Sequence, residues 1–407
     1  MDHSLSRREF AIQLGAASTS ILAAGYTATS FGFAANETIN IGCLGCGGRF
    51  RHLAGALARM KGIRIAAVCD VYDDHLDQAK KIADSKALVT KAFPEVLARP
   101  DIDAVLIAAP DHWHVPMTIA ACAAGKDVYV EKPLTHDLSE GRAVVDAQNR
   151  HQRIVQVGMQ QRSMPQFQEG LQIVRSGQLG KIHKVHLTWN RNQPRGTQSV
   201  SIDPSRVDWN AFLGNARKQP FNPYRFRQWR WFWDFGGGIL TDLMTHFIDV
   251  AHWYLDLDAP ATAATTGDNY QTKGLWETPD TMQTILNYPD KELQVYFEGS
   301  FVNARNAAMI EFMGRDATLY LDRGRYEIHP EAGKGKYQEK VLGSGGRGAD
   351  FYVQPDGELL HLSNWIECIR NRNKPNAPAE AGVSAVIPGH LGNLAYRNGQ
   401  VAKYSGG

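Results

Sequence analysis

Residues 39–50, INIGCLGCGGRF, decide the fold that we expect for this chain. A short apolar run comes first, and Gly45, Gly47 and Gly48 follow it where a helical pattern begins. Glycines between a strand and a helix allow a tight turn and let a pyrophosphate approach the helix N-terminus. Phe50 stands where the third glycine of the G-x-G-x-x-G pattern would be, so this motif alone is weak evidence.

An acidic residue after the second apolar run strengthens the interpretation. Asp70 follows the run 63–69 and stands 25 residues after Gly45. A carboxylate there can accept hydrogen bonds from ribose hydroxyls and repels a 2′-phosphate, which favours NAD over NADP. Arg49 beside the turn could partly offset that repulsion. The alternative is an ordinary glycine-rich turn with a surface aspartate.

Short β-branched runs alternate with helical patterns over the first part of the chain. Strands are predicted at 39–44, 63–69, 104–108, 127–130 and 154–157, and helices near 51–60, 72–84, 115–124 and 138–150. Apolar strands separated by helices are typical of a parallel sheet buried on both faces, as in a doubly wound fold.

The alternation of short strands and helices ends near residue 158, where we place a domain boundary. Later strands, predicted at 184–189, 282–287 and 293–298, are longer and part-polar, which suits an antiparallel sheet with one covered face. The stretch 331–348 looks like an exposed loop. We therefore expect an α/β protein with the following parts: a Rossmann dinucleotide-binding domain at 36–158, an α+β domain with a large, mainly antiparallel open sheet at 159–358, and C-terminal helices at 359–407.

Residues 1–34 have the three parts of an export signal. An Arg7-Arg8 pair precedes a weakly apolar stretch at 11–24 and small residues at 32–34. The run SRREF at 6–10 resembles the twin-arginine signal, which is read by a translocase that carries folded proteins. It predicts the twin-arginine machinery as a partner and a periplasmic or otherwise extracytoplasmic location. The alternatives are an arginine-rich helix packed on the domain and an uncleaved anchor.

Composition narrows the classes of partner. The 407 residues include 44 Lys and Arg against 42 Asp and Glu, so the net charge of +2 lacks the basic excess of a nucleic-acid binder. No apolar run reaches the length of a membrane span. Five sparse cysteines do not suggest a disulfide scaffold.

Polar clusters follow two of the predicted strands. Residues 110–114 read PDHWH after the fourth strand, and residues 131–133 read EKP after the fifth. The carboxyl ends of strands in an open α/β sheet form the binding crevice, so both clusters should face one ligand. The simpler interpretation of Glu131 and Lys132 is an ion pair on a loop.

Together with the glycine turn and Asp70, these clusters resemble the Gfo/Idh/MocA family, the glucose-fructose oxidoreductase and inositol dehydrogenase group. The resemblance spans residues 38–404 and implies that Lys132 lies near the nicotinamide and the substrate hydroxyl. It also implies that Pro110, His114 and Glu131 line the cofactor.

A glycine turn at 236–238 opens a helical pattern with polar residues at Asp242, His246 and Asp249. On an α-helix these positions share one face. The pattern alone leaves three interpretations open: a metal site, an acid favoured at a helix N-terminus, and a buried histidine whose hydrogen bonds are made within the core.

The resemblance points instead to a catalytic set of Lys132, Asp242 and His246 with no metal. His246 would take the hydroxyl proton, Asp242 would orient its ring and Lys132 would stabilise the developing charge. Whether His246 or Lys132 is the base stays open.

The remaining similarities to the family are less specific. At the family's domain crossover, Gln161 would contact the cofactor and Arg162 a substrate hydroxyl or a cofactor phosphate. Aromatic and guanidinium side chains stack on sugars and donate to hydroxyls, which makes three residues candidate substrate contacts: Arg225, Trp229 and Trp233. They could equally be core aromatics and a solvated arginine. The resemblance also implies that the C-terminal helix packs back on the nucleotide domain and that subunits pair through the open sheet.

Together, these expectations predict an exported NAD-dependent oxidoreductase. It would transfer a hydride from a secondary hydroxyl of a sugar, polyol or glycoside to the nicotinamide cofactor. One alternative is redox-neutral glycoside cleavage or sugar conversion through a transient ketone, which would suit a tightly held NAD. The other is a non-catalytic sugar-binding protein.

Overall fold

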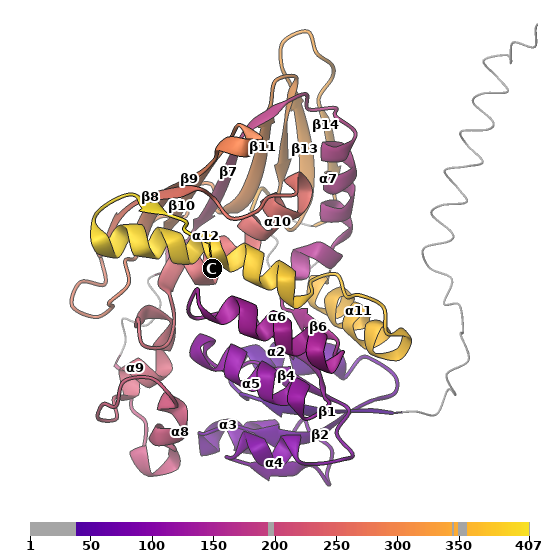
Figure 1. Ribbon diagram of the computed structural model, residues 1–407, viewed down its shortest axis with the longest axis vertical. Helices are drawn as coiled ribbons and strands as arrows, with labels where there is room; N and C mark the ends of the chain where they lie inside the picture. Colours follow the sequence, from indigo (N-terminus) through magenta and orange to yellow (C-terminus); the bar gives the residue numbers. More distant parts are fainter. Residues whose placement is uncertain (1–37, 194–198, 344–345, 349–355, 407) are drawn as a thin grey trace, which may run out of the picture. The chain divides into compact units, whose positions relative to one another are not determined.

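The computed structural model describes residues 38–193, 199–343, 346–348 and 356–406. The twin-arginine run and the rest of the expected export signal lie outside the described residues. Thr38–Gly407 is one compact unit, drawn from indigo to yellow in Figure 1. Among the described residues no helix has both the length and the apolar character to cross a membrane.

The first sheet is the parallel sheet that the sequence predicts. Its strand order is β3-β2-β1-β4-β5-β6, the order of a dinucleotide-binding Rossmann fold. The strands are β1 (Ile39–Leu44), β2 (Ile63–Cys69), β3 (Leu88–Thr90), β4 (Ala104–Ile107), β5 (Asp127–Val130) and β6 (Val155–Val157). Only β3 was not predicted, because three half-buried residues at a sheet edge leave little pattern.

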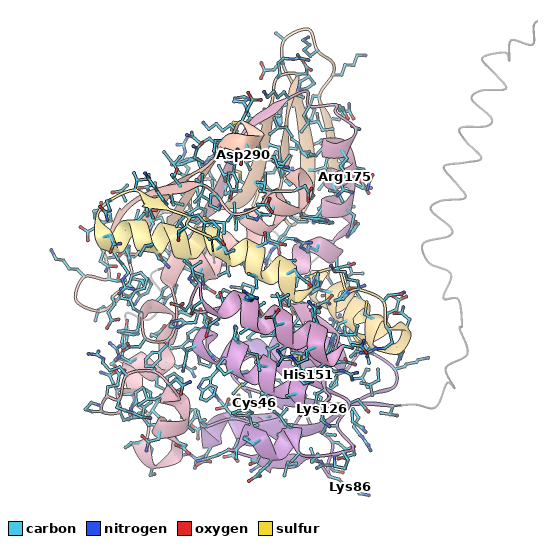
Figure 2. The ribbon with its side chains drawn as sticks, viewed as in Figure 1. Cys46, Lys86, Lys126, His151, Arg175 and Asp290 are labelled. Carbon is cyan, nitrogen blue, oxygen red and sulfur yellow. The ribbon has the colours of Figure 1, made fainter. Side chains whose placement is uncertain are left out.

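Helices cover both faces of this sheet (Figure 1). They are α2 (Gly48–Leu57), α3 (Asp73–Ala79), α4 (Phe93–Leu97), α5 (Asp111–Ala123) and α6 (Glu140–His151). The start of α5 corrects the predicted helix at 115–124, because residues 111–114 form its first turn and no loop. Burial also shields the thiols: all five cysteines are buried and free, and the labelled Cys46 lies inside this domain in Figure 2.

The second sheet has nine strands in the order β14-β13-β12-β11-β7-β10-β9-β8-β15. They are β7 (Ile182–Asn190), β8 (Thr262–Asp268), β9 (Thr281–Tyr288), β10 (Leu293–Ser300), β11 (Ala308–Gly314), β12 (Ala317–Leu321), β13 (Arg325–Pro330), β14 (Gln338–Val341) and β15 (Ala402–Lys403). All pairs are antiparallel except β7 with β10. The mainly antiparallel sheet is therefore confirmed. β14 lies within the stretch 331–348, so the expected loop there is partly wrong; a short polar edge strand resembles a loop in sequence.

Helices pack on one face of the second sheet. They are α7 (Pro165–Arg175), α10 (Thr245–Leu255) and α12 (Ala379–Asn398), while α11 (Gly357–Asn371) packs on α2 of the first domain. Side chains of β9 and β10 alternate between buried and exposed, as expected for a sheet with one covered face.

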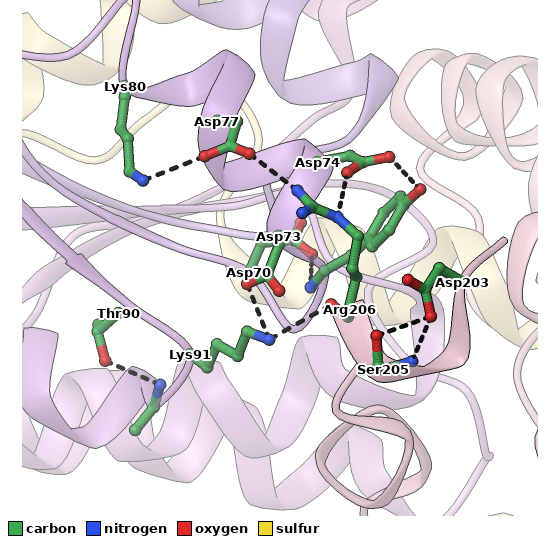
Figure 3. Close-up of polar contacts among 12 residues, drawn as sticks. Asp70, Asp73, Asp74, Asp77, Lys80, Thr90, Lys91, Asp203, Ser205 and Arg206 are labelled. Atoms are coloured by element: carbon green, nitrogen blue, oxygen red, sulfur yellow. Dashed lines mark hydrogen bonds and ion pairs between the residues drawn. The ribbon is translucent and has the colours of Figure 1, made fainter.

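A segment that leaves the second sheet between β7 and β8 returns to the first domain. Residues 199–235 contain η2 (Pro204–Arg206), α8 (Trp209–Leu213), α9 (Pro223–Arg227) and η3 (Trp229–Trp231), and they lie beside α3 and α5 in Figure 1. Val207 forms a β-bridge with Tyr72, and the Phe212 carbonyl accepts a hydrogen bond from the indole of Trp113 at 2.9 Å. Arg206 pairs with Asp74 and Asp77 of α3 (Figure 3). We call residues 199–235 the bridging segment.

Candidate active site

A cavity of about 830 Å³ opens at the carboxyl ends of the parallel strands and extends to the start of α10. Twelve of the sequence-predicted site residues line it: Gly45, Gly47, Gly48, Arg49, Asp70, Pro110, His114, Glu131, Lys132, Trp229, Asp242 and His246. The remaining predicted residues, Gln161, Arg162, Arg225 and Trp233, are not among its lining residues.

The glycine turn has the form that a pyrophosphate site needs. Gly45 has a φ of +85°, and a Cβ there would lie 2.6 Å from the backbone nitrogen of Ala109, so only glycine fits. Gly47 precedes α2, no side chain caps that helix, and its first residues, Gly48 and Arg49, line the cavity. Phe50, at the third glycine's place, is fully buried in the core instead.

Asp70 is held rigidly beside this turn. Its carboxylate accepts hydrogen bonds from the backbone N–H groups of Cys46 at 2.6 Å and Tyr72 at 2.9 Å, and lies 3.1 Å from Nδ1 of His75. His75 also lines the cavity, and no motif marks it in the sequence. The turn, the open helix N-terminus and this carboxylate together fit a dinucleotide.

Arg49 is engaged in two ion pairs. Its guanidinium pairs with Glu131 at 2.7 Å and with Glu358 of α11. The expectation that Arg49 could offset repulsion of a 2′-phosphate is therefore not supported, because two carboxylates already neutralise it. Glu358 was missed because it lies more than 200 residues farther along the chain.

His114 ties two strand-end loops together. It is almost fully buried, with Nδ1 2.6 Å from the Pro133 carbonyl oxygen and Nε2 2.9 Å from that of Ala109. These contacts fix the position of the loop that carries Lys132.

Lys132 and Asp242 form the central ion pair of the cavity. Nζ of Lys132 donates to both Oδ1 and the backbone carbonyl of Asp242, each at 2.6 Å, and Arg230 lies 3.7 Å from the same carboxylate oxygen. Asp242 stands on η4 (Leu240–Met244), a single π-helical turn that leads into α10. The i→i+5 spacing widens this turn and changes which positions share a face.

His246 is the second residue of α10 and is stacked on Trp189. The ring centroids are 4.9 Å apart with an interplanar angle of 18°. Nδ1 of His246 is buried and has no hydrogen-bond partner within the described part of the chain. Burial, followed by the nearby charges of Lys132 and Arg323, lowers the pKa of His246 well below its usual value. Asp242 pairs with Lys132, and the Trp189 ring stacks on the imidazole. Orientation of the His246 ring by Asp242 stays a prediction.

Two predicted arginines are committed to structural ion pairs. Arg162 makes a bidentate pair with the buried Asp249, with a closest distance of 2.7 Å. Arg225 pairs with Asp234 and Glu277 and covers the ring of Phe232. Neither is therefore available as the substrate contact we expected, because a nearby carboxylate holds each guanidinium outside the cavity.

The other two residues outside the lining differ from one another. Gln161 is buried on η1 (Gln160–Ser163), while its neighbour Gln160 reaches the cavity. The backbone N–H of Trp233 donates to Glu277, and Arg397 of α12 lies over its indole.

The metal-site alternative has no support in the described residues, where no group of three His, Cys, Asp or Glu side chains is arranged to hold an ion. Asp242 and Asp249 instead form ion pairs with two different basic side chains, Lys132 and Arg162.

Sequence reasoning also missed several lining residues from the second domain. They are Trp189 and Arg191 at the end of β7 and Arg323 between β12 and β13. No motif marks them, because they come from separate strands and loops that meet only in the fold.

Two family models match the chain. The oxidoreductase family model for an NAD-binding Rossmann fold matches residues 39–159, and the model for the C-terminal alpha/beta domain of that oxidoreductase family matches residues 172–403.

Among curated relatives, an uncharacterized oxidoreductase ORF334 of Rhizobium meliloti is 31% identical over 158 residues, which is 38% of this chain and 44% of that protein. Inositol 2-dehydrogenase of Serratia proteamaculans is 28% identical over 226 residues, 54% of this chain and 56% of the relative. A glycosyl hydrolase family 109 protein of Solibacter usitatus is 34% identical over 131 residues, 30% of each chain. The chain thus spans about half or less of the length of these relatives.

Solved structures share the fold. Levoglucosan dehydrogenase in complex with NADH and levoglucosan has a TM-score of 0.71 at 16% identity, covering 91% of this chain and 100% of that one. The aldose-aldose oxidoreductase from Caulobacter crescentus, complexed with glycerol, has a TM-score of 0.69 at 18% identity, covering 90% and 100%.

Proposed function

The chain belongs to the Gfo/Idh/MocA oxidoreductase family, and from that premise we propose that it is an NAD-dependent oxidoreductase acting on a secondary hydroxyl of a sugar, polyol or glycoside. The supporting observation is a single cavity that joins the glycine turn and Asp70 to Lys132, Asp242 and His246. A dinucleotide site and a proton-handling group in one cavity are what hydride transfer from a hydroxyl requires.

The residues at the glycine end would hold the cofactor. The first amides of α2 would bind the pyrophosphate and Asp70 the adenosine ribose hydroxyls. When bound, NAD supplies the hydride acceptor. NAD is proposed in preference to NADP because the Asp70 carboxylate would repel a 2′-phosphate and Arg49 is engaged elsewhere.

At the substrate end of the cavity, we assign His246 as the group that accepts the proton of the substrate hydroxyl. Its lowered pKa keeps the imidazole neutral near pH 7, so a ring nitrogen can accept the hydroxyl proton. Lys132 Nζ has three N–H donors, of which two are used on Asp242, and the third can stabilise negative charge on the substrate oxygen.

The direct test combines cofactor content with a substrate panel. Purified protein is denatured and released NAD is measured, and sugars, polyols and glycosides are then supplied while NADH absorbance and sugar release are followed. Steady NADH formation supports the dehydrogenase. A protein that binds sugars but does not bind NAD would instead support the alternative of a non-catalytic sugar-binding protein.

One observation favours redox-neutral chemistry as a second candidate. Asp208, Phe212 and Phe226 of the bridging segment line the cavity, and Arg206 and Trp113 fasten that segment to the first domain. A cofactor enclosed in this way would leave slowly. An enzyme whose NAD stays bound must end each turnover with NAD in its starting redox state, as in glycoside cleavage or sugar conversion through a transient ketone. Sugar release without net NADH in the same panel would select this candidate.

We also propose export by the twin-arginine route, which the run at residues 6–10 supports. An Arg7→Lys, Arg8→Lys double variant should accumulate in the cytoplasm while a reporter with a Sec signal is still exported. Export of that variant at the normal level would contradict the proposal.

Pairing of subunits through the second sheet is proposed as well. Tyr296 of β10 lies opposite Ile285 of β9 on the face away from α10, and Ile285 is 41% exposed. Light scattering should give an oligomer for the natural protein and a lower mass for Ile285→Glu. An unchanged mass for that variant would count against this interface.

A further inference from the structure

Asp111 differs from the other carboxyl groups that line the cavity. Among the described residues, these others are Asp70, Glu131, Asp208, Asp242, Asp356 and Glu358. Four of them form ion pairs with a lysine or an arginine, and Asp70 and Asp208 accept hydrogen bonds from backbone N–H groups. The Asp111 side chain makes no hydrogen bond or ion pair with another residue in the part of the chain that the structure describes.

The fold nevertheless places this carboxyl group inside the protein. Asp111 is the first residue of α5, directly after Pro110, and it is 3% exposed. The charged side chains that act on it are Asp242, Arg230 and Lys132. Lys132 lies 2.6 Å and Arg230 3.7 Å from the Asp242 carboxylate, so both cations are committed to that neighbour. Asp111 therefore has no counterion of its own.

A buried carboxyl group without a partner is favoured in its protonated form, because an unpaired charge is costly away from water. Burial, followed by the neighbouring Asp242, raises the pKa of Asp111 well above its usual value, although Arg230 and Lys132 act in the opposite direction. Protonation changes what the group can do. A carboxylate only accepts hydrogen bonds, whereas a protonated carboxyl group also donates one.

We propose that Asp111 acts as a neutral acid and donates a hydrogen bond to the substrate oxygen on which negative charge develops. The inference rests on the proposed function, because it adds a substrate-contacting group to the same cavity. When His246 accepts the hydroxyl proton, Asp111 and Lys132 would both stabilise the charge left on the oxygen. Asp111 keeps its own proton throughout, so the transfer of one proton and one hydride is unchanged. An ionised carboxylate in this place would repel the developing charge.

Infrared spectroscopy measures the protonation state directly, without any turnover. Spectra of the natural protein and of Asp111→Asn, both with NAD added, are compared at pH 7. Their difference should contain the carbonyl stretching band of a protonated carboxyl group, which the variant lacks. Asp146→Asn is the matched control and should give no such band, since the Asp146 side chain is 55% exposed on α6. Absence of the band from the natural protein overturns the inference.

Kinetics then test the donor role. Asp111→Asn keeps the size of the side chain and an N–H donor, so it should retain most of kcat/KM, whereas Asp111→Leu has no donor and should lose about 10²-fold. The kcat/KM of the natural enzyme should fall above pH 8 as Asp111 loses its proton, and in Asp111→Asn this fall should move to higher pH.

Two kinetic outcomes overturn the inference: an alkaline fall at the same pH in the natural enzyme and Asp111→Asn, or equal losses in Asp111→Asn and Asp111→Leu with NAD still bound. Failure of the proposed function looks different. A natural protein that shows the infrared band but neither contains nor binds NAD would refute the oxidoreductase and leave the protonation of Asp111 established.

Discussion

At the residue scale, the central contact joins distant parts of the chain. Lys132 Nζ and Asp242 Oδ1 are 2.6 Å apart although 110 positions separate the two residues. The side chain of Lys132 is held at both ends, since His114 fixes its loop and Asp242 its ammonium group. A cation positioned in this way can stabilise charge on a substrate oxygen without first being reordered.

Replacing Lys132 tests this role. Lys132→Met should lower kcat by about 10²- to 10³-fold, as removal of one donor from a developing oxyanion does. NAD content should change little, because the glycine turn and Asp70 remain. Lys86→Met, at an exposed position, is the control and should keep full turnover. A Lys132→Met enzyme with normal kcat would show that this ammonium group is not part of the chemistry.

The pH dependence should distinguish the two candidate bases. His246 faces Lys132, Arg323, Arg49 and Arg191, and burial together with these charges holds its pKa below 6.5. The neutral imidazole is the proton acceptor, so kcat/KM should stay level from pH 8 to 6.5 and fall only as the pH drops through the lowered pKa. A fall of kcat/KM that already begins between pH 8 and 6.5 would show that His246 is not the base. Profiles at constant ionic strength decide between them.

At the element scale, the pair Arg162 and Asp249 joins η1 to α10. Asp249 is fully buried, so the pair holds the helix that carries His246 against the end of the first domain. The sequence pattern suggested a substrate contact for Arg162, whereas the contacts indicate a structural role.

A stability measurement separates those two roles. Arg162→Ala leaves the Asp249 carboxylate buried without its partner and should lower the free energy of unfolding by about 3–5 kcal/mol, measured by urea denaturation. Arg162→Met combined with Asp249→Leu should lose less, because no unpaired charge remains. An unchanged unfolding midpoint with a raised KM for substrate would instead restore the substrate role.

At the scale of the whole molecule, the bridging segment connects the second sheet's domain back to the first. Its aromatic side chains pack around Tyr72, and Arg206 holds it to α3. The cavity wall therefore depends on contacts between parts of the chain that fold around different cores.

Loosening this connection should release the cofactor. Arg206→Gln is expected to speed exchange of bound NAD for labelled NAD several-fold while kcat with excess NAD stays near normal. Arg315→Gln, which removes an exposed ion pair with Asp316, is the control. Exchange at the natural rate in Arg206→Gln would argue against the bridging segment as the barrier to cofactor release.

Local pattern was sufficient for the architecture of this protein. The apolar runs, the turn at Gly45 and the alternation of later strands predicted both sheets, because strand and turn preferences act over a few residues. The same pattern, with the family resemblance, identified Lys132, Asp242 and His246, which do line one cavity.

Charge pairing and the composition of the substrate end were decided only by tertiary structure. Whether a guanidinium meets a buried carboxylate, as in Arg162 with Asp249, depends on which elements pack together. A single π-helical turn carries Asp242, whose carboxylate meets Lys132 from a distant loop, and the strand order of the second sheet brings the ends of β7 and β12 to the same side of the cavity. Electrostatic contacts act across space with no fixed spacing along the chain, so no sequence pattern records them.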